Sequence, residues 1–315
     1  MISKEKVKLS GRVLLCVACL CLFAGCGKKG NPTMKSFEKP AAVTEMRALH
    51  RDSKVIISWS YLRQAKVSIK GFYVERAEGR LPFETITFLQ GDSLQYSDNH
   101  FEINKEYRYK IRVYSMRNII SDDSLELKVI PLQLPDPPKA VAYRLTNDAV
   151  EIRWEQGADG NTYNIYRSAE KGKYQAPLNA NPLEKPFFRD GVDVEKPVFY
   201  SVRSIVQSTI RNEGDPSPDL EVNPHSFIPT KPTDLRYVGA NNKGYLTWKE
   251  NAETWVKGYK VYRARASGEY VPMTTVPAPL FVDDDPVSVR TSYYVTTMGP
   301  FNESEPSQVL IVNPQ

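Results

Sequence analysis

The sequence predicts an all-β protein whose chain forms three consecutive β-sandwiches. Tryptophans recur at Trp59, Trp154 and Trp248, with spacings of 95 and 94 residues. Each ends a run in which apolar and polar residues alternate, as in a strand with one buried face and one wet face. No stretch downstream of Cys26 shows sustained helical periodicity. A repeat of about 90 residues is long enough for a single sandwich core without disulfides.

The first 25 residues predict a secretory signal peptide. Residues 1–12 carry four basic side chains and one acidic side chain, and residues 13–24 are apolar. A basic stretch, a short apolar core and small residues at a cleavage site are typical of such a signal. As a helix the apolar run would span ~18 Å, well short of the ~30 Å hydrocarbon core of a membrane, which argues against a permanent transmembrane anchor.

The cleavage site resembles the lipobox of bacterial lipoproteins. Its residues are Phe23-Ala24-Gly25-Cys26, with Phe23 in place of the usual leucine. The resemblance implies cleavage after Gly25 and acylation of the Cys26 thiol, which would anchor the chain in a membrane. Gly27, where an aspartate would cause retention at the inner membrane, implies the outer membrane of a Gram-negative bacterium, with surface or periplasmic facing left open. The alternative is an ordinary signal peptide with a chance cysteine.

All four cysteines lie between Cys16 and Cys26. After cleavage only Cys26 would remain, so the mature chain would have no disulfide, thiolate nucleophile or cysteine zinc site. Residues 26–39 contain Gly, Pro, Ser and Lys and predict a flexible, lipid-anchored tether with a reach of up to ~45 Å. The Cys-Gly-Lys-Lys-Gly start also resembles small lipoproteins that accompany the lipopolysaccharide translocon; otherwise it is a basic spacer near anionic headgroups.

Four landmarks recur in the same order in each repeat. A tryptophan strand is followed by a strand that ends in arginine, then by an aromatic-x-Asp, then by a tyrosine that begins another strand. The members are Trp59, Trp154 and Trp248; Arg76, Arg167 and Arg263; Asp98, Asp190 and Asp283; Tyr109, Tyr200 and Tyr293. Proline-rich joints at residues 131–138 and 223–232 separate the repeats, because proline lacks the ladder donor. The predicted units are residues 40–132, 133–226 and 227–315.

The three repeats resemble fibronectin type III domains, which are immunoglobulin-like β-sandwiches. The family carries a tryptophan on its second strand and a tyrosine on its sixth, and the recurring Trp and Tyr landmarks match these two positions. The resemblance covers residues 40–315, nearly all of the mature chain. It implies an architecture but not a ligand, because such a fold hosts many unrelated functions.

The sequence predicts no enzyme, and we expect no catalytic residue, cofactor or metal ion. His50, His100 and His225 lie in different units or joints, without metal-ligand spacing, and are expected at the surface. No nucleophile, zinc-protease or phosphate-binding motif occurs. The run from Asp283 to Asp285 has two readings, a calcium site and a solvated turn.

Charge argues against a nucleic-acid partner. Removing residues 1–25 removes four basic side chains and one acidic side chain, which lowers the formal net charge from +5 to +2. A nearly neutral chain with interspersed signs has little electrostatic attraction to a polyanion.

Two further features have open readings. Arg76, Arg167 and Arg263 could form a ladder of cations across the units, or each could cover its own sheet with its aliphatic stem. Trp255, the fourth tryptophan, lies outside the repeat pattern. It could be an exposed binding residue, because tryptophans are frequent binding hot spots, or it could pack at the end of a domain.

Together these features predict a non-enzymatic, lipid-anchored envelope protein. It would be anchored to the membrane through Cys26 and would present a rod of sandwiches as a spacer or adhesion scaffold that binds another envelope protein or a polysaccharide. One alternative is a subunit or assembly partner of outer-membrane machinery, suggested by the Cys-Gly-Lys-Lys-Gly start. Another is an accessory carbohydrate-binding partner of a separate enzyme, with Trp255 as the binding residue.

Overall fold

The computed structural model describes residues 39–266, 268–285 and 287–314, and these are mainly strands and connecting loops. The first sandwich contains β1 (Glu45–Arg51), β2 (Lys54–Ser60), β3 (Ile69–Glu78), β4 (Glu84–Gln90), β5 (Gln95–Asp98), β6 (Tyr107–Ser115) and β7 (Leu127–Val129). The second contains β8 (Ala142–Leu145), β9 (Ala149–Arg153), β10 (Thr162–Ser168), β11 (Phe187–Gly191), β12 (Val198–Gln207), β13 (Arg211–Pro216) and β14 (Leu220–Val222). The third contains β15 (Thr233–Ala240), β16 (Lys243–Lys249), β17 (Gly258–Arg265), β18 (Val271–Val276), β19 (Leu280–Asp283), β20 (Thr291–Met298) and β21 (Leu310–Val312), after a short 3-10 helix, η2 (Pro224–Ser226).

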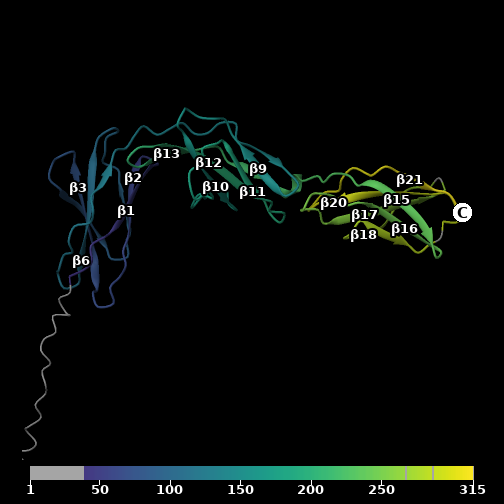
Figure 1. Cartoon of the computed structure of the whole chain (residues 1–315), viewed down its shortest axis with the longest axis horizontal. Coiled ribbons are helices and arrows are strands. Elements are labelled where there is room, and N and C mark those ends of the chain that lie inside the picture. Colours follow the sequence, from purple (N-terminus) through teal and green to yellow (C-terminus); the bar gives the residue numbers. More distant parts are fainter. Residues whose placement is uncertain (1–38, 267, 286, 315) are drawn as a thin grey trace, which may run out of the picture.

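Each sandwich packs a three-stranded sheet against a second sheet. These are β1-β2-β5 against β4-β3-β6-β7, β11-β9-β8 against the sheet of β10, β12, β13 and β14, and β15-β16-β19 against β18-β17-β20-β21. This strand order confirms the predicted all-β class of three tandem fibronectin type III-like sandwiches (Figure 1). In the described part of the chain, no helix is long and apolar enough to cross a membrane. The predicted signal peptide, Cys26 and most of the tether lie outside the described residues.

The recurring aromatic landmarks form the three cores. The indole rings of Trp59, Trp154 and Trp248 lie edge-on to Phe72, Tyr163 and Tyr259, with ring centroids 5.4, 5.3 and 5.2 Å apart. Aromatic pairs in this geometry add roughly 0.5–1.5 kcal/mol to the stabilisation from buried area. The landmark tyrosines Tyr109 in β6, Tyr200 in β12 and Tyr293 in β20 are fully buried. The alternation that predicted these strands therefore corresponds to alternate residues facing the core.

The first and second sandwiches share one sheet. Strand β1 pairs in parallel with β13, with Leu49 opposite Arg211 and His50 opposite Asn212. The pairing produces a seven-stranded sheet in the order β10-β12-β13-β1-β2-β5, with β14 also paired to β12. Strand β13 therefore covers the edge of β1 at Leu49 and His50, where N–H and C=O groups would otherwise be unpaired.

The tip of the β12–β13 hairpin inserts into the first sandwich. Ile210 at this tip is 3% exposed and belongs to the core of the first sandwich. Beside it, Ser208 Oγ donates to the Ile130 carbonyl at 2.9 Å, and the Ile130 N–H donates to Thr209 Oγ1 at 2.9 Å. The hairpin thus binds the core of the preceding sandwich and also satisfies backbone groups of the linker.

The third sandwich reaches back into the second in a similar way. Trp255 belongs to the core of the second sandwich, with its ring 5.6 Å from that of Phe227. Its indole N–H donates to the Thr146 carbonyl at 3.2 Å, and the Thr254 N–H donates to the Asn147 carbonyl at 2.7 Å. At both joints, an apolar side chain of the later sandwich fills the end of the earlier one.

The three sandwiches do not form a straight rod. Figure 1 shows the first sandwich turned away from the line of the second and third. The proline-rich linkers restrict their own backbone, but they do not determine the direction in which the next sandwich packs. At the first joint that direction follows from the β1–β13 pairing and the insertion of Ile210.

We expect Ile210→Ala to lower the free energy of unfolding of the first sandwich by about 2–4 kcal/mol, because it leaves a cavity in that core. The first transition in urea-induced unfolding would measure the change. Ile228→Ala is the matched control, since Ile228 is 67% exposed, and it should change the free energy by less than about 0.5 kcal/mol. Equal effects of the two variants would contradict the insertion of Ile210.

Candidate functional site

The arginine, aspartate and tyrosine landmarks meet within each sandwich. In the first, Asp98 Oδ2 accepts hydrogen bonds from Arg76 Nη1 at 2.7 Å and from Tyr109 OH at 2.8 Å. Asp98 lies on β5 in one sheet, whereas Arg76 on β3 and Tyr109 on β6 lie in the other. The carboxylate, 1% exposed, therefore links the two sheets.

The same bridge is present in the other two sandwiches. Asp190 Oδ2 accepts from Arg167 Nη1 at 2.8 Å and from Tyr200 OH at 3.0 Å; Asp283 Oδ2 accepts from Arg263 Nη1 at 2.8 Å and from Tyr293 OH at 2.7 Å. Burial raises the pKa of all three tyrosines, and the adjacent aspartate raises it further, so each phenol stays a donor. Because each arginine binds an aspartate of its own sandwich, the three do not form a ladder of free cations. The constant order of the landmarks was the sequence signal for these bridges.

The acidic run in the third sandwich is held by basic side chains. Asp283 is 3% exposed and belongs to the bridge, Asp285 lies 3.2 Å from Arg263 Nη1, and Asp284 pairs with Lys243 at 2.6 Å. The solvated-turn reading is therefore wrong for Asp283, which is buried. Over residues 39–266, 268–285 and 287–314, no group of three side chains is placed to hold a metal ion.

An open groove of about 640 Å³ lies where the first two sandwiches join. One wall comes from β1 and β2, with Arg47, Leu49 and Ile56. The other comes from β10 and β13, with Tyr166 and Arg211 among its residues. Because these strands belong to one continuous sheet, the two walls are connected through main-chain hydrogen bonds.

A buried carboxylate lies against this groove. Glu213 is 1% exposed; its Oε1 accepts from Asn164 Nδ2 at 2.9 Å and from Tyr166 OH at 2.5 Å, and its Oε2 lies 3.4 Å from Arg51 Nη1. Burial raises the pKa of Tyr166, and the charge of Glu213 raises it further. A buried charge is tolerated only when it is paired and hydrogen-bonded. Here Arg51 comes from the first sandwich, so the site is complete only at the joint.

His50 lies on the core side of the same joint. It is 2% exposed, its Nδ1 is 3.1 Å from Asn212 Oδ1, and its ring is edge-on to Phe101 at 5.0 Å. Burial lowers the pKa of His50. The expectation of a surface residue is thus wrong for His50, whereas His100 and His225 are exposed.

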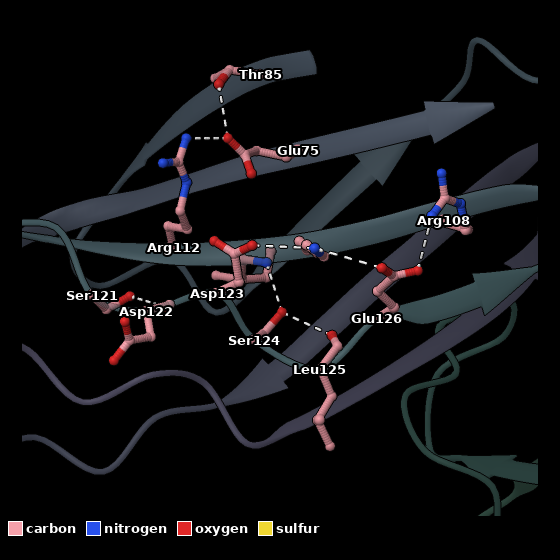
Figure 2. Close-up of polar contacts among 12 residues, drawn as sticks. Glu75, Thr85, Arg108, Arg112, Ser121, Asp122, Asp123, Ser124, Leu125 and Glu126 are labelled. Carbon is pink, nitrogen blue, oxygen red and sulfur yellow. Dashed lines mark hydrogen bonds and ion pairs between the residues drawn. The ribbon is translucent and has the colours of Figure 1, made fainter. Parts of the chain in front are cut away.

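The outer face of the first sandwich carries alternating charges (Figure 2). Strand β6 projects Arg108, Lys110 and Arg112, which pair with Glu126 at 3.1 Å, with Asp123 at 3.1 Å and with Glu75. The Ser124 and Ser121 hydroxyls accept from the N–H groups of Ile111 and Val113, which fixes the carboxylate-bearing segment beside β6. Each of these three cations already has a partner, and surface pairs of this kind contribute only ~0–1 kcal/mol each.

The outer face of the third sandwich is aromatic. The rings of Tyr262 and Tyr294 stack with centroids 4.5 Å apart, and Tyr270 lies 4.7 Å from Tyr294. Glu303 accepts from Tyr262 OH at 2.8 Å and from Lys260 Nζ at 2.9 Å. This face is ordered by its own contacts, so the groove at the first joint is the stronger candidate for a ligand site.

The structure places one of the two site residues that the sequence predicted, Trp255, and does not describe the other, Cys26. Trp255 is 5% exposed and lies against Phe227, so it is closed to a ligand, and its reading as an exposed binding residue is wrong. A loop tryptophan suits either role, and only the position of the neighbouring sandwich distinguishes them. Cys26 lies outside the described residues, and its acylation stays a prediction.

No protein-family model matches the chain, and no curated protein sequence matches it. Among solved structures, the chain is similar to the chicken CNTN1 FN1-FN3 domains, with 14% identity over 88% of this chain and 98% of that chain and a TM-score of 0.26. It is also similar to an Fn3-like protein from Clostridium thermocellum, with 23% identity over 28% of this chain and 94% of that chain and a TM-score of 0.25. The class of the protein rests on the strand order and cores described above.

We expect Asp98→Asn to lower the free energy of unfolding by about 1–3 kcal/mol, because Arg76 and Tyr109 lose a charged acceptor between the sheets. Urea unfolding would measure it, with the exposed Asp92→Asn as the matched control. A double-mutant cycle with Arg76→Gln should show coupling between Arg76 and Asp98. Additive losses would contradict the bridge.

We expect the stability of the first joint to fall as the pH drops below about 6.5, because His50 then binds a proton in the unfolded chain more readily than in the native protein. Urea unfolding across this range, compared between the natural chain and His50→Gln, would measure the effect. The variant keeps a side-chain donor for Asn212 and should show a smaller pH dependence. The same dependence in both proteins would contradict this role.

Proposed function

We propose that the protein is a non-enzymatic, lipid-anchored envelope protein that presents three interlocked sandwiches as a binding scaffold. The observation that carries the proposal is the interlocking itself. Ile210 and Trp255 are each buried in the sandwich that precedes their own. Sandwiches on independent linkers would lack such contacts, and their surfaces would not keep a fixed relation to one another.

The anchor is supported by the sequence alone. The lipobox-like Phe23-Ala24-Gly25-Cys26 follows a short apolar run, and residues 26–39 have the composition of a tether. Each buried methylene of an acyl chain adds ~0.8 kcal/mol, so the several chains of a lipoprotein cysteine would hold firmly where one would not. Gly27 favours the outer membrane.

The partner is another envelope protein or a polysaccharide. Such a partner suits a scaffold whose described cavities are open grooves rather than enclosed pockets. A carbohydrate-binding role centred on Trp255 is not part of the proposal, because that side chain is buried.

We expect Cys26→Ser to move the protein from the membrane fraction to the soluble fraction, because acylation requires the thiol. Immunoblots of fractionated cells would measure the shift. Cys21→Ser is the matched control: it lies before the cleavage site and should leave the protein in the membrane fraction. A Cys26→Ser variant that stays with the membrane would refute the lipid anchor.

Protease treatment of intact cells, followed on the same immunoblots, resolves the facing. Loss of the natural protein would place the sandwiches on the cell surface, and protection would place them in the periplasm.

A further inference from the structure

The groove at the first joint holds two cations that have no partner among the described residues. Arg47 on β1 and Arg211 on β13 are both exposed and line the groove, and neither side chain makes a hydrogen bond or an ion pair with the described part of the chain. Leu49 lies opposite Arg211, and Arg47 is two residues from Leu49. From strand geometry, the Cα atoms of the two arginines are therefore about 8 Å apart.

The other charges at the groove are already balanced. Glu213 is paired with Arg51 and bound by Asn164 and Tyr166. Asp52, on the β1–β2 turn, pairs with Arg203 at 3.0 Å. The uncompensated charge of the lining is therefore positive and comes from Arg47 and Arg211, whose guanidinium groups suit carboxylate or phosphate oxygens.

The groove floor does not suit main-chain recognition of an extended peptide. The sheet is continuous from β10 to β5, and β13 occupies the edge of β1 at Leu49 and His50, which leaves at most residues 45–48 of that edge for another strand. A peptide that binds by strand addition needs an open edge. The lining instead combines Leu49, Ile56 and Pro177, which offer apolar contact, with the hydroxyl of Ser58 and the amide of Gln95. These groups complement the faces and the hydroxyls of sugar rings.

We propose that this groove binds an acidic polysaccharide through Arg47 and Arg211. The inference rests on the proposed scaffold function and names its ligand class and site. A volume of about 640 Å³ is sufficient for a short segment of a glycan chain. The groove exists only because β13 pairs with β1, so each sandwich alone carries half of the site.

The test uses the full chain, purified in detergent, and three fluorescently labelled probes. These are an oligogalacturonate, the same oligomer with its carboxylates methyl-esterified, and an oligoglutamate of similar length. Fluorescence anisotropy should show that the oligogalacturonate binds and that its neutral ester binds at least about tenfold more weakly, since the ester lacks the charge that the arginines recognise. Binding should also weaken as salt increases.

Arg47→Gln combined with Arg211→Gln should weaken oligogalacturonate binding about tenfold or more. The matched control is Arg236→Gln combined with Lys249→Gln, which removes two exposed cations from β15 and β16 and should leave binding unchanged. Arg236 is equivalent in position to Arg47. Arg47 on β1 pairs with Ser58, the residue before Trp59, and Arg236 on β15 pairs with Thr247, the residue before Trp248. Urea unfolding of both variants would verify that the fold is intact.

Three results would overturn the proposal: no binding of the oligogalacturonate, equal binding by the two double variants, or tighter Arg47-dependent binding of the oligoglutamate, which would assign the groove to an acidic peptide. The fractionation of Cys26→Ser does not depend on these arginines. A protein that is lipid-anchored but does not bind the glycan would refute the groove inference alone, whereas a protein that binds the glycan without an anchor would refute only the anchor.

Discussion

The parallel pairing of β1 with β13 is the contact on which the first two sandwiches depend. It covers the edge of β1 at Leu49 and His50, brings Ile210 into a core built by other strands, and sets the direction in which the second sandwich leaves the first. It also makes two buried polar groups tolerable, because His50 is bound by Asn212, and Glu213 is balanced by Arg51. Each of these pairs joins the two sandwiches, so separating them would leave Glu213 without its cation and β1 with unpaired edge groups.

Inside each sandwich, an aspartate links the two sheets, as a disulfide does in many secreted domains. Every cysteine of the chain lies at or before Cys26, so the sandwiches contain none. Asp98 and its counterparts instead accept hydrogen bonds from an arginine and a tyrosine of the facing sheet. The side chains of the three arginines stay 12–40% exposed, so each ion pair keeps some contact with water, which reduces its desolvation cost. Each of the three sandwiches therefore has the same link between its sheets, and this link does not need an oxidising environment to form.

The sequence predicted the sandwiches because their signal is local: a strand with one buried face alternates with period two, and the tryptophan and tyrosine landmarks mark its core side. The joints have no local signal. His50 and Asn212 are 162 residues apart, and Trp255 looks the same in a sequence whether it is exposed or buried by a neighbour. One clue was present, since Met46, Ala48 and His50 alternate on the inner side of β1 opposite Trp59, Ile57 and Val55. That register places the histidine in the interior.

The outer faces and the joint differ in how their polar groups are satisfied. Arg112 on the first sandwich is already held by Glu75, and Lys260 on the third is held by Glu303, so a ligand at either place must first displace a bonded partner. At the joint, the sheet register brings Arg47 and Arg211 together from strands that belong to different sandwiches, and neither guanidinium group makes an ion pair within the described residues. Unpaired cations beside a concave floor favour a ligand that brings its own anions. The β1–β13 pairing that stabilises the joint thus also places the two unpaired arginines in one groove.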